Sequence, residues 1–134
     1  MQSIALVLAN ILDQFTPALQ TIPEDKMTFK PSPGKWSKKE IIGHLADSAQ
    51  NNIRRFIVAQ YETNPHIVYK QDNWVVISGY QYYDTAELIS LWRLLNKHIV
   101  MILKNTPPEA MSRQCLTGSL HTIEWLAEDY IKHL

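Results

Sequence analysis

The sequence has very little cysteine. Cys115 is the only one, so the chain cannot form an internal disulfide. Small secreted domains often depend on several disulfides, whereas a single free thiol is typical of a reducing compartment. With 134 residues, the chain can bury about two-thirds of the surface that its unfolded form exposes. We therefore expect one domain over residues 1–134 and a cytoplasmic location.

Glycine is also scarce, with four residues in the whole chain. Nucleotide-binding loops use several closely spaced glycines so that backbone N–H groups can surround the phosphates, and no such loop is present. The metal-binding patterns HExxH, CxxC and the EF-hand loop are absent as well. A nucleotide cofactor is therefore not expected, and any metal site must be assembled by the fold.

The chain has no excess of charge of either sign, because thirteen Lys and Arg balance thirteen Asp and Glu. Nucleic acids and anionic membranes both select basic surfaces. No apolar run approaches the roughly 20 residues of a membrane span, and the apolar N-terminus lacks the basic region and cleavage site of a signal peptide. We expect neither nucleic acid nor a membrane as the partner.

Hydrophobic periodicity predicts four helices and no credible sheet. The predicted helices cover residues 2–14, 38–61, 84–104 and 122–134. Two alternatives are open just after the first predicted helix. Either Pro17 kinks a helix that resumes through Leu19, or Thr16 caps a short second helix in which Pro17 is the first residue. Four helices joined by long crossover loops make an all-α four-helix bundle.

Three long connectors separate these helices: residues 22–36, 62–83 and 105–121. The first contains three prolines and a glycine, which favour loops. In the second, the apolar run Trp74–Ile77 is short enough to be a strand, a helical turn or an ordered loop, and we treat the segment as a crossover loop. The third contains Cys115, either a nucleophile or, as its surroundings favour, an idle thiol.

The second helix has the best-defined start in the chain. Ser37 and Glu40 have the spacing of a capping box, in which each side chain bonds a free backbone N–H of the other residue. Trp36 and Ile41 have the spacing of the accompanying hydrophobic staple. Because the start of this helix is well defined, the direction of the His44 side chain, one turn later, is determined as well.

A stripe of polar residues lies beside the apolar stripe of this helix. At about 100° per residue, His44, Ser48, Asn51 and Arg55 share one face, with Asp47 at its edge. A surface helix normally places its polar face opposite the core. Polar side chains beside the core instead suit the wall of a cleft.

Two histidines on different predicted helices, His44 and His133, are candidate metal ligands. Helical bundles often hold metals between facing helices, and neutral imidazole suits Zn, Ni, Fe or Cu. Spacing alone favours the alternative that the two histidines are unrelated. Asp47 and Asp129 could orient the imidazoles, and His98 lies at an apolar margin as a core or pocket-lining residue.

His66 and His121 fall in predicted loops, with no surrounding pattern that suggests a function. The carboxylates suggest no general acid–base pair, because Glu40 is accounted for by helix capping. No catalytic residue is therefore assigned from the sequence.

Three stretches of the chain carry a family resemblance. The first comprises Lys35-Trp36-Ser37, Glu40-Ile41, His44-Leu45, Asp47-Ser48, Asn51-Asn52 and Arg54-Arg55-Phe56. The others are Tyr69, Gln71-Asp72 and Trp74-Val75, then Thr122–Leu126, Asp129-Tyr130 and His133-Leu134. Together, from about residue 30 to the end, they resemble the DinB-like (YfiT-like) superfamily of metalloenzymes.

The resemblance implies a four-helix bundle, often a homodimer, with a divalent metal bound by one histidine on the second helix and an HxxxH pair on the last. Carried onto this sequence, the metal ligands are His44 and His133. The third ligand would fall four residues after His133, beyond Leu134. We therefore expect the last helix to be truncated in this sequence; if it is complete, metal binding is weak or absent.

The function that the resemblance implies is a metal-dependent transferase or hydrolase acting on a small-molecule substrate, with Zn or Ni and a low-molecular-weight thiol as cosubstrate. From helix geometry, Asn51 and Arg55 are placed to bind the carboxylates of that thiol. The alternative is a metal-free bundle that binds a small molecule or a protein. DNA binding, suggested by the superfamily's damage-inducible name, is contradicted by the zero net charge.

Overall fold

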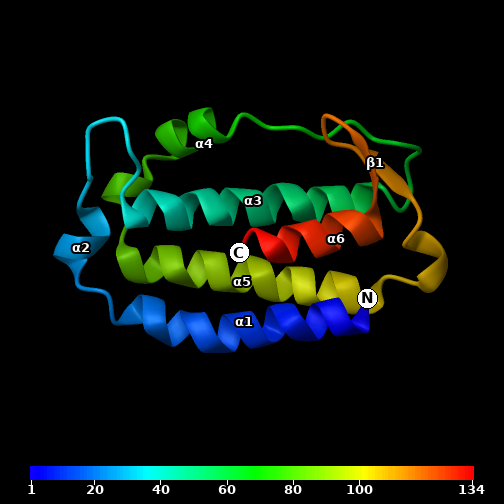
Figure 1. Ribbon diagram of the computed structural model, residues 1–134, viewed down its shortest axis with the longest axis horizontal. Coiled ribbons are helices and arrows are strands. Elements are labelled where there is room, and N and C mark those ends of the chain that lie inside the picture. The colour runs from blue at the N-terminus through cyan, green and yellow to red at the C-terminus, as the bar shows by residue number, and fades with distance from the viewer.

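The computed structural model describes residues 1–134 and confirms the all-α four-helix bundle (Figure 1). The bundle helices are α1 (Gln2–Gln20), α3 (Lys38–Val58), α5 (Thr85–Asn105) and α6 (Ile123–Lys132). The connectors hold α2 (Glu24–Thr28), α4 (Gln71–Ser78), the 3-10 turns η1 (Tyr80–Tyr82) and η2 (Pro108–Ala110), and the strands β1 (Gln114–Leu116) and β2 (Leu120–Thr122). None of the helices has the length and apolar character needed to cross a membrane.

Helix α5 lies in the middle of the bundle and packs against both α1 and α3 (Figure 1). The shorter α6 packs against α1 and α3, so the last part of the chain closes the fourth side. One continuous core fills the space between these helices, and Leu8, Phe56, Leu88, Ile99 and Ile123 are fully buried in it. The face of α3 next to α6 is therefore the place where a cleft can form.

The predicted starts of α3, α5 and α6 are confirmed. Each start depends on contacts between residues that are close together in the sequence. The Ser37 hydroxyl accepts from the Glu40 N–H at 3.1 Å, and the Glu40 carboxylate accepts from the Ser37 N–H at 3.0 Å. Asp84 caps α5 by accepting from the Glu87 N–H at 3.0 Å. Thr122 caps α6 in the same way. Helix α3 ends at Val58, slightly before the predicted residue 61.

Helix α1 is longer than predicted and contains Pro17 within it. The alternative in which Thr16 begins a separate helix is therefore wrong. Two apolar residues of this helix, Val7 and Phe15, are 46% and 47% exposed. The contacts of α1 with α5 and α6 bury Leu8 and Leu12 instead.

The connectors hold more regular structure than expected. Residues 62–83 are not simply a crossover loop, because they include α4, which packs on α3 and ends at Gly79 in the left-handed conformation (φ 66°). The expectation that no strands are present is also wrong, because β1 and β2 pair as an antiparallel hairpin with Cys115 opposite His121. Elements this short contain too few residues for periodicity to be recognised.

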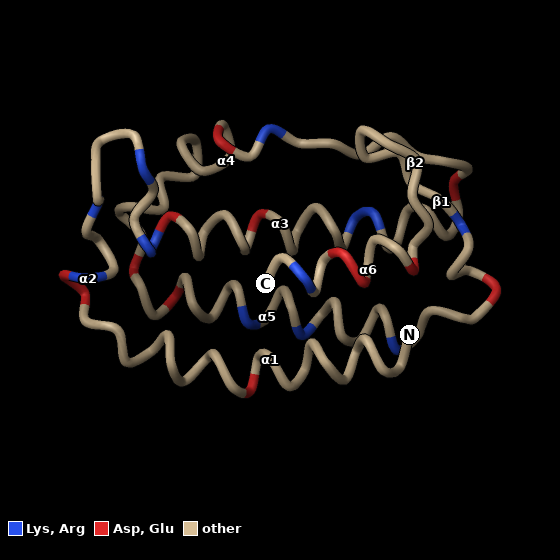
Figure 2. The backbone as a smooth tube through the Cα atoms, in the orientation of Figure 1, with Lys and Arg blue, Asp and Glu red and all other residues tan.

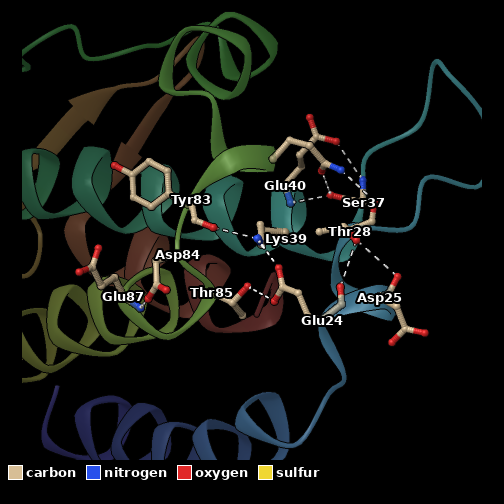
Figure 3. Close-up of polar contacts among 11 residues, drawn as sticks. Glu24, Asp25, Thr28, Ser37, Lys39, Glu40, Tyr83, Asp84, Thr85 and Glu87 are labelled. Atoms are coloured by element: carbon tan, nitrogen blue, oxygen red, sulfur yellow. Dashed lines mark hydrogen bonds and ion pairs between the residues drawn. The ribbon is translucent and has the colours of Figure 1, made fainter.

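A buried lysine joins three elements at the start of α3 (Figure 3). Lys39 is 4% exposed, and its ammonium donates to Glu24 at 2.6 Å and to the Tyr83 carbonyl at 2.8 Å. The Thr85 hydroxyl donates to the other oxygen of Glu24 at 2.5 Å. These bonds hold α2 and the beginning of α5 against the first turn of α3, and so help to set the position of that helix.

Candidate active-site pocket

A pocket of about 580 Å³ opens between α3 and α6. Helix α3 contributes Ile41, His44, Leu45, Ser48, Asn52 and Arg55, whereas α6 and the residues after it contribute Trp125, Leu126, Asp129, Tyr130, His133 and Leu134. Tyr69, Gln71, Thr117 and His121 complete the lining from the connectors. The polar stripe predicted on the second helix thus does flank a cleft.

His44 lies one turn after Glu40 in α3, and its ring packs against Trp36 with 5.1 Å between the ring centroids. Its Nδ1 atom is buried and has no hydrogen-bond partner. Burial lowers the pKa of His44 below the ordinary value, partly opposed by the negative charges of Asp47 and Asp72. The neutral imidazole is therefore favoured, and this is the form that binds metals.

His133 follows the last residue of α6 and is exposed. Its Nδ1 atom lies 2.8 Å from the backbone carbonyl of Asp129. Because a carbonyl only accepts, this hydrogen bond places the proton on Nδ1 and leaves the lone pair of Nε2 available. The Asp129 carboxylate lies 3.7 Å from the same Nδ1, beyond hydrogen-bonding distance, so the backbone carbonyl of Asp129 is the group that orients the ring.

Two histidines from two helices therefore line one pocket. The structure contains no group of three His, Cys, Asp or Glu side chains arranged to hold a metal ion. Imidazole nitrogens are ligands that Zn²⁺ and Ni²⁺ prefer, and the buried Nδ1 of His44 has no protein partner. The pocket lining thus contains two imidazoles but no complete metal-binding group.

Arg55 is the one Lys or Arg residue in the pocket lining. Its Nε donates to the Ile67 carbonyl at 3.1 Å, and its guanidinium lies 6.0 Å from the centroid of the Tyr69 ring. Burial lowers the pKa of Arg55, although a guanidinium keeps its charge at every physiological pH. With Nε held by the backbone, the remaining guanidinium N–H groups can bind an anion.

Not every predicted pocket residue lines the pocket. Asn51 is 7% exposed and donates to the Asp47 carbonyl at 2.9 Å, and the neighbouring Asn52 lines the pocket in its place. At about 100° per residue, Asn51 lies some 20° from His44 on the side away from Ser48, whereas the pocket lies on the Ser48 side. His98 is exposed on α5 and lies outside the pocket.

Asp47 also lies outside this pocket, although it is only 1% exposed. It makes no hydrogen bond to His44, because its Oδ1 accepts from the Tyr80 hydroxyl at 2.5 Å. Burial raises the pKa of Asp47, whereas this hydrogen bond and the charge of His44 act in the opposite direction. Any effect of Asp47 on His44 is therefore through its charge rather than through a shared proton.

Sequence reasoning missed an aromatic pair in the pocket wall. The rings of His121 and Trp125 are stacked, with 3.6 Å between centroids and 8° between their planes. His121 belongs to β2 and Trp125 to the first turn of α6. Only the hairpin and the cap at Thr122 bring the two rings together, so helical spacing could not have revealed the pair.

Cys115 is a buried thiol with no place in this pocket. Its Sγ donates to the Pro65 carbonyl at 3.3 Å, and burial raises the pKa of the thiol. Reactive cysteines have a lowered pKa and some exposure. Cys115 is therefore the structural thiol that the sequence favoured.

The family model described as the DinB superfamily matches residues 8–134. Comparison with curated protein sequences gives no match.

Two solved structures share the fold. The first, YfiT from Bacillus subtilis, is described as a probable metal-dependent hydrolase with an unusual four-helix bundle topology. It matches this chain with a TM-score of 0.86 and 20% sequence identity, and the match covers 98% of this chain and 77% of YfiT. The second, a mycothiol-dependent maleylpyruvate isomerase, has a TM-score of 0.76 at 13% identity, over 96% of this chain and 56% of that one. At such identities the likeness establishes the fold.

Proposed function

Because this chain belongs to the DinB superfamily, we propose that it is a metal-dependent enzyme acting on a small molecule in the pocket between α3 and α6. The observation that carries the proposal is that His44 and His133, far apart in the sequence, line the same pocket. Support also comes from the description of the structural relative YfiT as a probable metal-dependent hydrolase.

In this proposal, His44 and His133 hold a divalent ion, Zn²⁺ or Ni²⁺. Bound there, the ion would supply Lewis acidity to a thiol or water. The chain's own contribution is to present both imidazoles to the pocket: burial disfavours the protonated form of His44, and the Asp129 carbonyl orients the ring of His133. Trp36 packs on His44 and restricts its ring further.

The reaction we propose is thiol-dependent transfer, with hydrolysis as the alternative within the same class of site. Low-molecular-weight thiols commonly carry carboxylates, and Arg55 offers guanidinium N–H groups that suit bidentate binding of a carboxylate. Asn52 and Ser48, joined by a 2.8 Å hydrogen bond from the Asn52 amide to the Ser48 carbonyl, lie between Arg55 and His44 along α3. The second structural relative is described as mycothiol-dependent, which supports a thiol cosubstrate.

The test is a calorimetric titration of the metal-free protein with Zn²⁺ and with Ni²⁺, together with metal analysis of the protein as purified. We expect about one ion per chain, and binding weakened at least tenfold in H44A and in H133A. H98A is the matched control, since His98 is an exposed histidine outside the pocket. Unchanged metal affinity in H44A would contradict the proposal.

A second candidate function is a metal-free module that binds a small molecule, and it is favoured by the lack of any three-residue metal-binding group. The same titrations separate the two candidates. If the protein is a metal-free binding module, titration of the unmodified protein with metal should release no heat of binding. A carboxylate-bearing thiol should still shift the NMR signals of Arg55 and Trp125.

A further inference from the structure

A second cavity, of about 290 Å³, lies on a different face of α3 and shares no lining residue with the active-site pocket. Its walls come from α3, α4, η1 and α5. Asp47 contributes a carboxylate, and Trp74, Tyr80 and Tyr83 contribute aromatic rings. Gln50 and Ser78 add neutral polar groups, so polar and apolar surfaces both line the cavity, and Asp47 is its one acidic group.

The Asp47 carboxylate is held by one neighbour only. Tyr80 packs so closely on Gly43 that a Cβ at that position would lie 2.1 Å from its ring. This contact brings the Tyr80 hydroxyl to Oδ1 of Asp47, at 2.5 Å. The other oxygen, Oδ2, is buried and has no hydrogen-bond partner.

No cationic side chain is available to balance this carboxylate within the cavity, because the lining contains no Lys, Arg or His. Asp47 forms no ion pair elsewhere, whereas the buried Lys39 is paired with Glu24. A buried carboxylate oxygen without a donor is costly, so a ligand that brings both a positive charge and an N–H group is favoured.

The remaining walls suit the same kind of ligand. Aromatic faces attract cations, and Trp is the most effective of the aromatic residues. Leu91 and Leu95 offer apolar contacts to an alkyl or aryl group. An inorganic cation such as Ca²⁺ or Mg²⁺ usually binds more than one carboxylate, whereas Asp47 is the only carboxylate in these walls.

We propose that this cavity binds the ammonium group of a small organic amine. The ammonium donates a hydrogen bond to Oδ2 of Asp47, and the apolar part of the amine contacts Trp74, Tyr83 and the two leucines. The cavity lies just below the range of about 300–1,000 Å³ that is typical of ligand pockets, which restricts the amine to a small one. The proposal does not depend on metal binding at His44.

The test is an NMR titration of ¹⁵N-labelled protein with benzylammonium at neutral pH. We expect saturable shifts at Asp47, Trp74 and Tyr80. Benzyl alcohol, a neutral analogue of the same shape, should bind at least tenfold more weakly, because it lacks the charge. H98A should bind benzylammonium as the unmodified protein does, since His98 is exposed and lines neither pocket.

The decisive variant is D47N, which keeps the shape of the side chain but removes its charge, and which should weaken benzylammonium binding at least tenfold. Thermal unfolding establishes that D47N is folded; if it is not, W74L provides a second test and should weaken binding several-fold. Equal binding of benzyl alcohol, undiminished binding to folded D47N, or no binding by the unmodified protein at millimolar concentration would each overturn the proposal.

Discussion

Gly43 shows how a single residue can be constrained by a contact that helix propensity does not reveal. In the interior of a helix, replacing glycine by alanine usually stabilises by up to about 1 kcal/mol. At this position, however, an added Cβ would lie 2.1 Å from the ring of Tyr80, well inside van der Waals contact. The clash should therefore outweigh the gain in helix propensity.

We predict that G43A lowers the free energy of unfolding by about 1–3 kcal/mol, the usual cost of overpacking a core. Urea denaturation measures the change. G34A is the matched control, because no atom lies within 4 Å of the position its Cβ would take, and its effect should stay within about 0.5 kcal/mol. A G43A protein as stable as the unmodified one would show that Tyr80 can move aside freely.

At the scale of elements, α3 depends on local chemistry at its start. Ser37 is fully buried, caps the helix, and also donates to the Gln81 side chain at 2.5 Å. Its hydroxyl thus links the first turn of α3 to η1. The loss of this single group affects both the helix end and the connection between two elements.

We predict that S37A lowers the free energy of unfolding by about 1–2 kcal/mol, at the upper end for loss of an N-cap. Chemical denaturation measures this value. T122A, which removes the cap of the shorter α6, provides a comparison in which no second side-chain bond is lost. A cost for S37A no larger than for T122A would mean that the bond to Gln81 contributes nothing to stability.

The contact between α2 and α3 should make stability depend on pH. Hydrogen bonds from Lys39 and Thr85 hold the pKa of Glu24 below its ordinary value of 4.5. A carboxyl whose pKa is lowered by folding stabilises the folded state above its unfolded pKa, and this contribution is lost as the pH falls through the folded pKa.

E24Q should therefore be less stable than the unmodified protein at neutral pH, and the difference should shrink as the pH falls below 4.5. Thermal unfolding at a series of pH values measures it. Glu128 makes no ion pair, so E128Q should change the unfolding free energy by less than about 0.5 kcal/mol at neutral pH. A difference for E24Q that grows toward acid pH would contradict the assigned role.

For the whole molecule, the charges are balanced in number and interspersed in space. Blue and red segments are both scattered over the helices and connectors in Figure 2, and the formal net charge is zero. Nucleic acids are bound through many neutralised phosphates, which a surface of this kind does not favour.

We accordingly predict no binding of duplex DNA at physiological ionic strength. Fluorescence anisotropy of a labelled duplex checks this prediction at several salt concentrations. Binding that weakens steeply as salt is added would reveal a basic surface that the overall charge conceals.

The starts of the main helices and the stripe that flanks the pocket could be predicted from the sequence, because caps and helical periodicity depend on residues within one or two turns. Ser37, Asp84 and Thr122 illustrate this at α3, α5 and α6. The hairpin β1–β2 could not be predicted, since its three-residue strands exist only through their pairing with each other.

The sequence by itself determined that the chain is a four-helix bundle and that His44 lies on a polar stripe beside the core. Tertiary structure alone decided that His44 and His133 share a pocket and that Asn52 rather than Asn51 lines it. The physical reason is range. Helix capping and periodicity act between near neighbours, whereas a pocket depends on how helices distant in the sequence pack and rotate against one another.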